Sequence, residues 1–318
     1  MTSRLSPILV ALVLLVLPAT ATAADAAAGA PPKATVKIKL GNLQGGKAEI
    51  YSKVRVFGTV KPYVRGQKVE LTFFRNGRKL VRHKLAVGKG KNGTGKFRAW
   101  IRVTRDGKYA ASARHRATAA LGGDSTIRKS WRVSFPALRK GQCGDVVVGF
   151  KRALRKMGYI TNGGRCFKGR TARGVLAYRK VNEMARTTHA GAGLVKRVFA
   201  GRGGYKVRHP GAGRHAEAPL SKQVLVFAKG DRPVAIYPIS SGTPGTPTVT
   251  GHYEFIRTEP GYNNKEMYYS WYFYRGYAVH GYKSVPDYPA SHGCLRTFIA
   301  DQPEVYERIQ YGEDIFIW

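Results

Sequence analysis

The chain has 318 residues, and its 55 lysines and arginines against 18 aspartates and glutamates give a formal net charge of +37. A chain of this length can form about two or three domains and is long enough to bury a sizeable hydrophobic core. A protein with so high a positive charge attracts polyanions in general. Nucleic acid is the partner most often inferred from such a charge.

Residues 1–23 have the features of an export signal. Arg4 precedes an apolar run at 8–17 that is too short to span a bilayer, and small residues follow at 21–23. We expect cleavage near Ala23 and a protein secreted to the cell wall, peripheral to the membrane at most; an uncleaved amphiphilic anchor is the alternative. The polyanions available there are wall polymers, lipid headgroups and peptidoglycan carboxylates, so nucleic acid is not expected as a partner.

Residues 31–136 alternate between apolar and polar side chains. The pattern is clear at 36–40, and Asn76-Gly77 stands where a hairpin needs a turn. Several short strands at this spacing predict an antiparallel β-sandwich. The segment resembles the immunoglobulin-like modules of bacterial surface proteins. Its outward lysines and arginines form either an ordinary solvated face or a binding surface for anionic wall polymers.

The apolar spacing becomes helical between residues 138 and 203. Val147, Phe150 and Leu154 recur at offsets of three and four, and predict one face of a helix. The segment resembles the small three-helix peptidoglycan-binding module often found beside cell-wall enzymes. Lys151 stands where that family commonly has a glutamine, and Arg179 stands at the second such position. The resemblance leaves two alternatives, a module adapted to anionic polymer or a spacer.

Three cysteines are present in the chain. Cys143 and Cys166 both lie in the helical segment, and in an oxidising compartment they are expected to form a disulfide worth about 3 kcal/mol. That pairing leaves Cys294 as the one reactive thiol.

The glycine-rich, basic stretch at 201–213 is predicted to be a linker. His209 and the nearby His215 are interpreted as ordinary polar loop residues. A hairpin over 224–236 is then expected to open the last domain.

The residue types of a cysteine acyl-transfer site gather near the C-terminus. His280-Gly281 is followed by Ser291-His292-Gly293-Cys294 and then by Arg296. A thiol needs a base beside it to act as a nucleophile, and a tetrahedral oxyanion needs backbone N–H groups from a tightly turned chain. No metal or organic cofactor is implied.

These motifs resemble the L,D-transpeptidase catalytic-domain family, which crosslinks or trims peptidoglycan. The family pattern is a His-Gly, a spacer, then Ser/Thr-x-Gly-Cys with Arg or Asn two residues later. The stretch Thr246–Gly251 is similar to the family's strand entry. The resemblance implies a β-rich domain over 216–318, and therefore a multidomain, mainly β chain that acts on peptidoglycan stem peptides.

The resemblance also implies catalytic roles for two side chains. Cys294 would attack the carbonyl of an L-to-D peptide bond and form a thioester. His280 would deprotonate it, held in the correct tautomer by a carbonyl near Gly281. We expect the Cys294 thiol to be ionised beside this imidazole.

Further roles follow for the residues around the nucleophile. His292 and Gly293, together with the cysteine itself, would supply the oxyanion-binding backbone. Arg296 would steer a substrate carboxylate, and Gly281 and Ser291 belong to the same substrate-binding wall. Structural hydrogen bonding of the loop is the alternative for His292 and Arg296.

Other readings of the motif are weaker. In papain-like proteases the cysteine precedes its histidine, and a zinc site lacks the usual paired ligand spacing here. Two alternatives stay open, an L,D-carboxypeptidase in which water replaces the amine acceptor, and a non-catalytic cationic protein that binds the wall.

Overall fold

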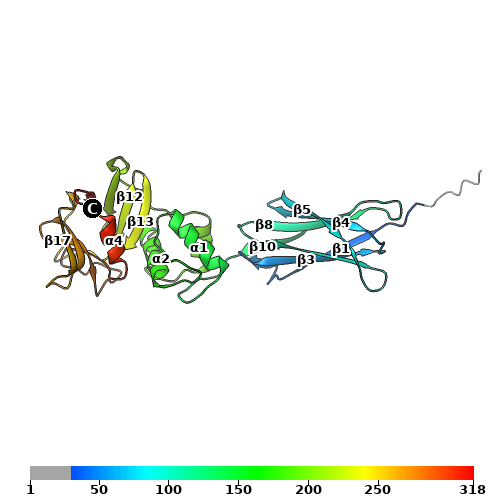
Figure 1. The fold of residues 1–318 in the computed structure, drawn as a ribbon, viewed down its shortest axis with the longest axis horizontal. Coiled ribbons are helices and arrows are strands. Elements are labelled where there is room, and N and C mark those ends of the chain that lie inside the picture. Colours follow the sequence, from blue (N-terminus) through cyan, green and yellow to red (C-terminus); the bar gives the residue numbers. More distant parts are fainter. Residues whose placement is uncertain (1–29) are drawn as a thin grey trace, which may run out of the picture.

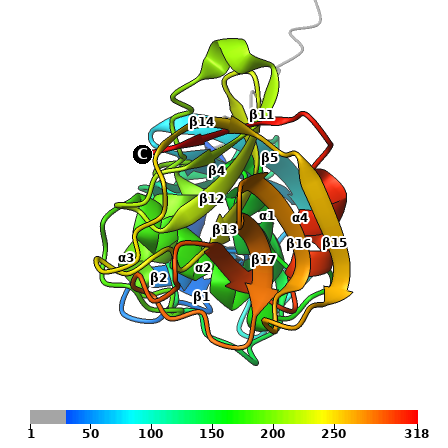
Figure 2. The ribbon, with the colours of Figure 1, turned by 90° about the vertical axis from the view of Figure 1, so that its left-hand side faces the viewer.

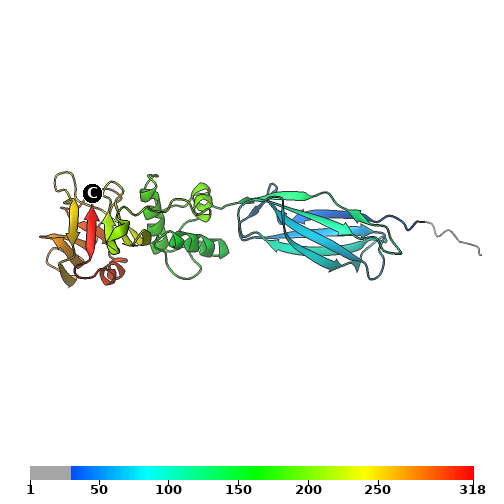
Figure 3. The same cartoon turned by 90° about the horizontal axis from the view of Figure 1, so that it is seen from above.

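The computed structural model describes residues 30–318, so the expected export signal at 1–23 lies outside the described range. The molecule is elongated, with a β-domain at one end, helices in the middle and a second β-rich domain at the other end (Figure 1); Figure 3 shows the same order from above. The prediction of a multidomain, mainly β chain is confirmed. No helix within residues 30–318 is long and apolar enough to cross a membrane.

The N-terminal domain consists of two sheets packed face to face. The first has the order β1 (Thr35–Gly41), β3 (Lys53–Lys61), β7 (Gly95–Arg102) and β6 (Gly88–Lys89). The second has the order β2 (Lys47–Glu49), β10 (Lys129–Ser134), β8 (Lys108–His115), β4 (Lys68–Arg75) and β5 (Arg78–Ala86), with β9 (Asp124–Ser125) beside β8. The alternating residues that face inward, such as Val54 and Leu71, are fully buried.

One strand pair of this domain departs from the predicted antiparallel pattern. β10 pairs with β2 in parallel, with Arg132 opposite Lys47. The reason is topological, because the chain leaves β1 in one sheet and places the short β2 at the edge of the other, beside its last strand.

Three helices follow, α1 (Asp145–Lys156), α2 (Gly169–Val181) and α3 (Ala192–Phe199). The predicted disulfide between Cys143 and Cys166 is confirmed. Phe199, at the end of α3, packs against the N-terminal domain through Tyr51 and Phe135.

The two basic residues in the expected glutamine positions have local structural contacts. The ammonium of Lys151 is buried and donates hydrogen bonds to the carbonyls of Gly163, Gly164 and Cys166, at 2.7–3.1 Å. Arg179 donates to two loop carbonyls near the end of α2. Both side chains therefore hold loops together, which offers no support for the interpretation that they are adapted to a polymer.

The C-terminal domain contains two sheets and one helix (Figure 2). The first sheet has the order β13 (Arg232–Pro238), β12 (Val224–Lys229), β11 (Arg214–Ala218), β19 (Asp314–Ile317) and β14 (Gly251–Glu254). The second has the order β15 (Arg257–Tyr262), β16 (Tyr268–Tyr274), β17 (Tyr277–Tyr282) and β18 (Leu295–Phe298), and α4 (Gln302–Arg308) packs against β16.

The interpretation of His215 as a loop residue is wrong. It lies in β11 and is fully buried, with its Nε2 3.4 Å from a carboxylate oxygen of Glu217. The strand begins at Arg214, directly after the glycine-rich stretch, so His215 lies inside the strand and not in the linker.

The helices and the C-terminal domain share one apolar core. Phe150 and Tyr178 belong to the same buried cluster as Val226 of β12 and Ile236 of β13. The helical region is therefore a fixed support for the first sheet of the C-terminal domain.

Candidate active site

Two neighbouring parallel strands carry the predicted catalytic side chains. β17 and β18 pair with Val279 opposite Leu295 and His280 opposite Arg296. Cys294 directly precedes β18. Because alternate residues of a strand point to the same face, Cys294, Arg296 and His280 share one face of this pair. The structure thus places the thiol, the imidazole and the guanidinium on the same face of this strand pair.

His280 is held as a neutral base. Its Nδ1 lies 2.9 Å from the carbonyl oxygen of Gly281, so Nδ1 carries the proton and Nε2 keeps its lone pair. Burial lowers the pKa of His280 to about 4; the Gly281 carbonyl opposes this shift, and the Arg296 charge adds to it. At neutral pH the imidazole is therefore unprotonated and ready to accept a proton.

The surroundings of Cys294 favour the neutral thiol over the thiolate that the sequence led us to expect. Burial raises the pKa of the Cys294 thiol, although the Ala278 N–H and the charges of Arg296 and Lys265 work in the opposite direction. The Sγ lies 3.6 Å from the carbonyl oxygen of Gly276, which accepts its hydrogen bond. The reason is the apolar wall around the sulfur, formed by Met267, Tyr272 and Ala278.

Hydroxyl groups hold the loop that carries the thiol. Ser291 Oγ donates to the Cys294 carbonyl at 2.6 Å and accepts from the Gly293 N–H at 3.1 Å. Thr248 Oγ1 donates to the Gly293 carbonyl at 2.7 Å. Within the described part of the chain, the N–H groups of His292 and Cys294 have no acceptor. These two amides, rather than that of Gly293, are free to bind an oxyanion.

Gly293 is required by both conformation and space. Its φ is +115°, a region that L side chains rarely adopt. A Cβ at this position would lie 2.4 Å from the Cε1 atom of Tyr277. The tight turn before the nucleophile therefore accepts only glycine.

The remaining predicted residues differ in exposure. His292 is exposed, whereas Gly281 and Ser291 are buried. Arg296 is partly buried; its Nη1 donates to the Ala290 carbonyl at 3.0 Å, and its guanidinium lies 4.1 Å from the centre of the Tyr282 ring. Arg296 thus holds the loop between the two strands, as the structural alternative predicts, and keeps further N–H groups for other acceptors.

Sequence reasoning missed Gln302, at the start of α4. It is fully buried and donates to the Tyr269 carbonyl at 2.5 Å; it also bonds to Thr297, whose Oγ1 donates to the His280 carbonyl at 3.3 Å. A Cβ on Gly281 would lie 2.9 Å from the Gln302 Cβ. This explains the glycine after the catalytic histidine, and α4 thereby supports the histidine strand from behind.

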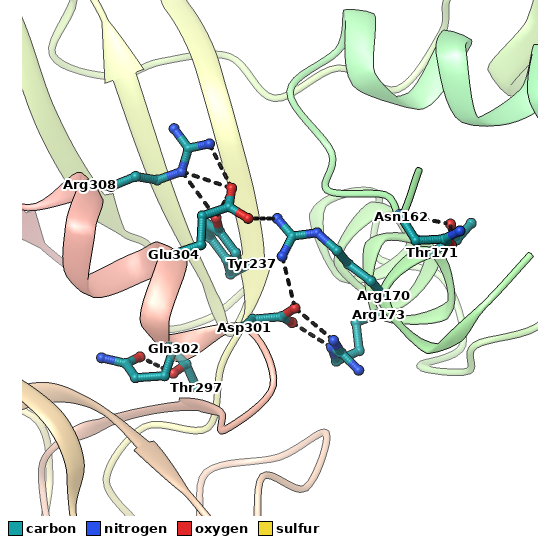
Figure 4. Close-up of polar contacts among 10 residues, drawn as sticks. All are labelled: Asn162, Arg170, Thr171, Arg173, Tyr237, Thr297, Asp301, Gln302, Glu304 and Arg308. Carbon is teal, nitrogen blue, oxygen red and sulfur yellow. Dashed lines mark hydrogen bonds and ion pairs between the residues drawn. The ribbon is translucent and has the colours of Figure 1, made fainter. Parts of the chain in front are cut away.

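Two arginines of α2 fix the same helix to the helical region (Figure 4). Arg173 forms a bidentate ion pair with Asp301, in which Nε lies 2.5 Å from Oδ2 and Nη2 lies 2.7 Å from Oδ1. Arg170 bonds to both Asp301 and Glu304. Asp301 directly precedes α4 and is 1% exposed. The helical region therefore anchors the helix that supports the active-site strands.

Replacing Arg173 with alanine is expected to destabilise the C-terminal domain. The change leaves a buried carboxylate with only the longer Arg170 contact, 3.3 Å, and a loss of about 2–3 kcal/mol in the free energy of unfolding follows. Urea unfolding measures this loss, with Arg152→Ala, on the exposed face of α1, as the control. Equal stability of the two variants would contradict the role of the pair.

Comparison with known proteins agrees with this architecture. Residues 213–317 match the YkuD family, described as the L,D-transpeptidase catalytic domain. The chain is similar to the crystal structure of an L,D-transpeptidase from Xylanimonas cellulosilytica, with 25% identity, a TM-score of 0.53, and coverage of 57% of this chain and 98% of that one. An L,D-transpeptidase from Stackebrandtia nassauensis matches with 16% identity and a TM-score of 0.35, over 58% of this chain and 96% of that one. No curated protein matches the chain.

Residues 213–317 therefore form a domain of the YkuD family, the L,D-transpeptidase catalytic domain, within a multidomain and mainly β chain.

Proposed function

We propose that the protein is an exported L,D-transpeptidase that forms a thioester through Cys294. The observation that carries this proposal is the presence of a free thiol and of an imidazole whose Nε2 is unprotonated on one face of two adjacent strands, in a domain of this family. The substrates are peptidoglycan stem peptides, which supply both the acyl donor and the acceptor amine.

The first half-reaction begins from neutral groups. The thiol of Cys294 turns from the Gly276 carbonyl toward His280, gives its proton to Nε2, and its sulfur attacks the carbonyl carbon of an L-to-D peptide bond. The resulting oxyanion accepts hydrogen bonds from the N–H groups of Cys294 and His292. The C–N bond then breaks, the leaving amine takes the proton from the imidazolium, and a thioester remains.

The second half-reaction restores the enzyme. The amine of an acceptor stem loses a proton to the His280 base and attacks the thioester, and the thiolate leaves and is protonated. A new amide bond crosslinks the two stems. Arg296 has N–H groups beyond the one used by Ala290, and we assign them to a carboxylate of the donor stem.

The pH dependence of Cys294 alkylation is expected to show that the resting thiol is neutral. Burial raises its pKa, so the rate of reaction with iodoacetamide should be slow at pH 7 and should rise about tenfold per pH unit without levelling off at pH 9. Turnover should be lost only as the pH falls through about 4, where His280 becomes protonated. A plateau of alkylation near neutral pH would show a resting thiolate and contradict this mechanism.

Muropeptide analysis tests the reaction itself. Purified protein is incubated with disaccharide-tetrapeptides, and the products are separated by mass. New crosslinks between stems support the transpeptidase, and shortened stems alone indicate an L,D-carboxypeptidase. If the products of the parent protein do not differ from those of Cys294→Ala, the protein is a non-catalytic wall-binding protein.

Export is a separate part of the proposal. It rests on the sequence of residues 1–23, where a basic residue precedes a short apolar run and a small-residue site. Mass spectrometry of the secreted protein should find an N-terminus near residue 24. A secreted chain that still begins at Met1 would contradict cleavage.

A further inference from the structure

A cavity of about 670 Å³ lies in the N-terminal domain, far from Cys294. Its walls come from the loop between β3 and β4, and from the end of β8 with the loop that follows it. β3 begins beside Tyr51, which contacts the helical region, and ends at Lys61. The cavity is therefore at the end of the sandwich that points away from the helices and the catalytic domain (Figure 1).

Positive charge dominates the walls of this cavity. Its basic residues are Arg65, Lys68, Lys84, Arg114 and Arg116. Its one carboxylate, that of Glu70, lies between Lys84 and Arg114 in the strand register and bonds to Arg116 at 3.0 Å. Within residues 30–318, Lys84 and Arg114 have no carboxylate at ion-pair distance. These cations are available to an anion.

Two buried polar groups in the same walls lack partners. His115 is 2% exposed and its Nδ1 has no hydrogen bond; Gln67 is 6% exposed and its Oε1 has no donor among the described residues. Both atoms have almost no accessible surface, so they are enclosed within the walls and do not face the cavity.

A second hollow continues the first. It shares Arg114, His115 and Arg116 with the cavity and adds Lys33, together with the carboxylate of Asp124, which accepts a hydrogen bond from the Val36 N–H. Together the two hollows form a cationic track at the tip of the sandwich. A track with several positive positions suits a chain of repeated anionic units better than a single small anion.

We propose that this track binds a polymer of polyol phosphates. The guanidinium and ammonium groups of the track bind the phosphodiester oxygens. An anionic wall polymer of this chemistry would hold the far end of the molecule while the catalytic domain stays free to reach peptide stems. The inference does not depend on acyl transfer, since binding is measurable with an inactive catalytic domain.

Binding of a labelled oligomer of glycerol phosphate to the full chain tests the proposal. Fluorescence anisotropy near 0.15 M salt should show binding that the double variant Lys84→Gln/Arg114→Gln weakens at least about tenfold. The matched control, Lys37→Gln/Lys39→Gln, removes the same charge from exposed positions of β1 in the other sheet, and should change the Kd less than about twofold. Cys294→Ala should bind as the parent does.

Thermal unfolding separates binding from folding. Lys84 and Arg114 are both exposed, so the melting temperature of Lys84→Gln/Arg114→Gln should stay close to that of the parent while its affinity falls. An equal loss of affinity in the two charge variants would show that binding depends only on the net positive charge of the protein, and would overturn the proposal. Binding to phosphatidylglycerol vesicles but not to the oligomer, equal affinity for a DNA oligonucleotide, or no binding at all would also overturn it.

Discussion

Replacing Cys294 with alanine is expected to abolish crosslink formation, with a loss in turnover of roughly 10³-fold or more, because no other described side chain can form the thioester. The two remaining cysteines are joined in the disulfide of the helical region and cannot substitute. Loss of a small, partly buried side chain leaves a space that costs about 1 kcal/mol or less in stability. Muropeptide analysis measures the activity, and thermal unfolding measures the fold.

Met267→Leu provides a matched control for this variant. Met267 lies in the same apolar cluster as the thiol, and leucine keeps its volume, so activity should stay within about threefold of the parent. Crosslinking by Cys294→Ala at more than about a tenth of the parental rate would show that another group is the nucleophile.

Replacing Gly293 with valine is expected to lower turnover by about 10²–10³-fold while Cys294 and His280 remain present. Valine cannot adopt a φ of +115° without strain, and its Cβ would overlap the Tyr277 ring. Relief of either conflict turns the peptide groups on both sides of position 293. The neighbouring amides would then no longer point at the oxyanion, so kcat should fall more than KM rises.

The matched control is Gly245→Val, in the loop that precedes the strand entry. A Cβ there would meet only Thr243 Oγ1, at 4.0 Å, so the same substitution has room. Steady-state kinetics with a tetrapeptide donor compare the two variants. Similar turnover for Gly293→Val and Gly245→Val would contradict the requirement for glycine before the nucleophile.

Local sequence patterns were enough to predict the fold class and the disulfide. Alternating residues such as those at 36–40 form strands because one face of each strand is buried. Helical spacing at Val147, Phe150 and Leu154 yields a buried face of α1 for the same reason. The family motif identified His280 and Cys294 as candidates, and the structure places them on one face because the parallel pair of β17 and β18 aligns residues that a loop separates in sequence.

The sequence could not predict properties that arise only after packing. The neutral state of the Cys294 thiol depends on the apolar wall from β16 and β17, and the low pKa of His280 depends on its burial. Asp301 and Gln302 follow the motif closely, yet their partners come from α2 and β16, so no local pattern marks them. Lys151 shows the same limit, since a basic residue on a helix gives no sign that loop carbonyls will surround it.

The mass of the acyl-enzyme tests the central claim most directly. The protein is mixed with a tetrapeptide donor in the absence of an acceptor amine, quenched in acid during turnover, and digested. We predict that the peptide containing Cys294 gains the mass of the acyl part of the stem, and that Cys294→Ala gains none. Turnover with no adduct on Cys294, or with the adduct on another residue, would contradict the account.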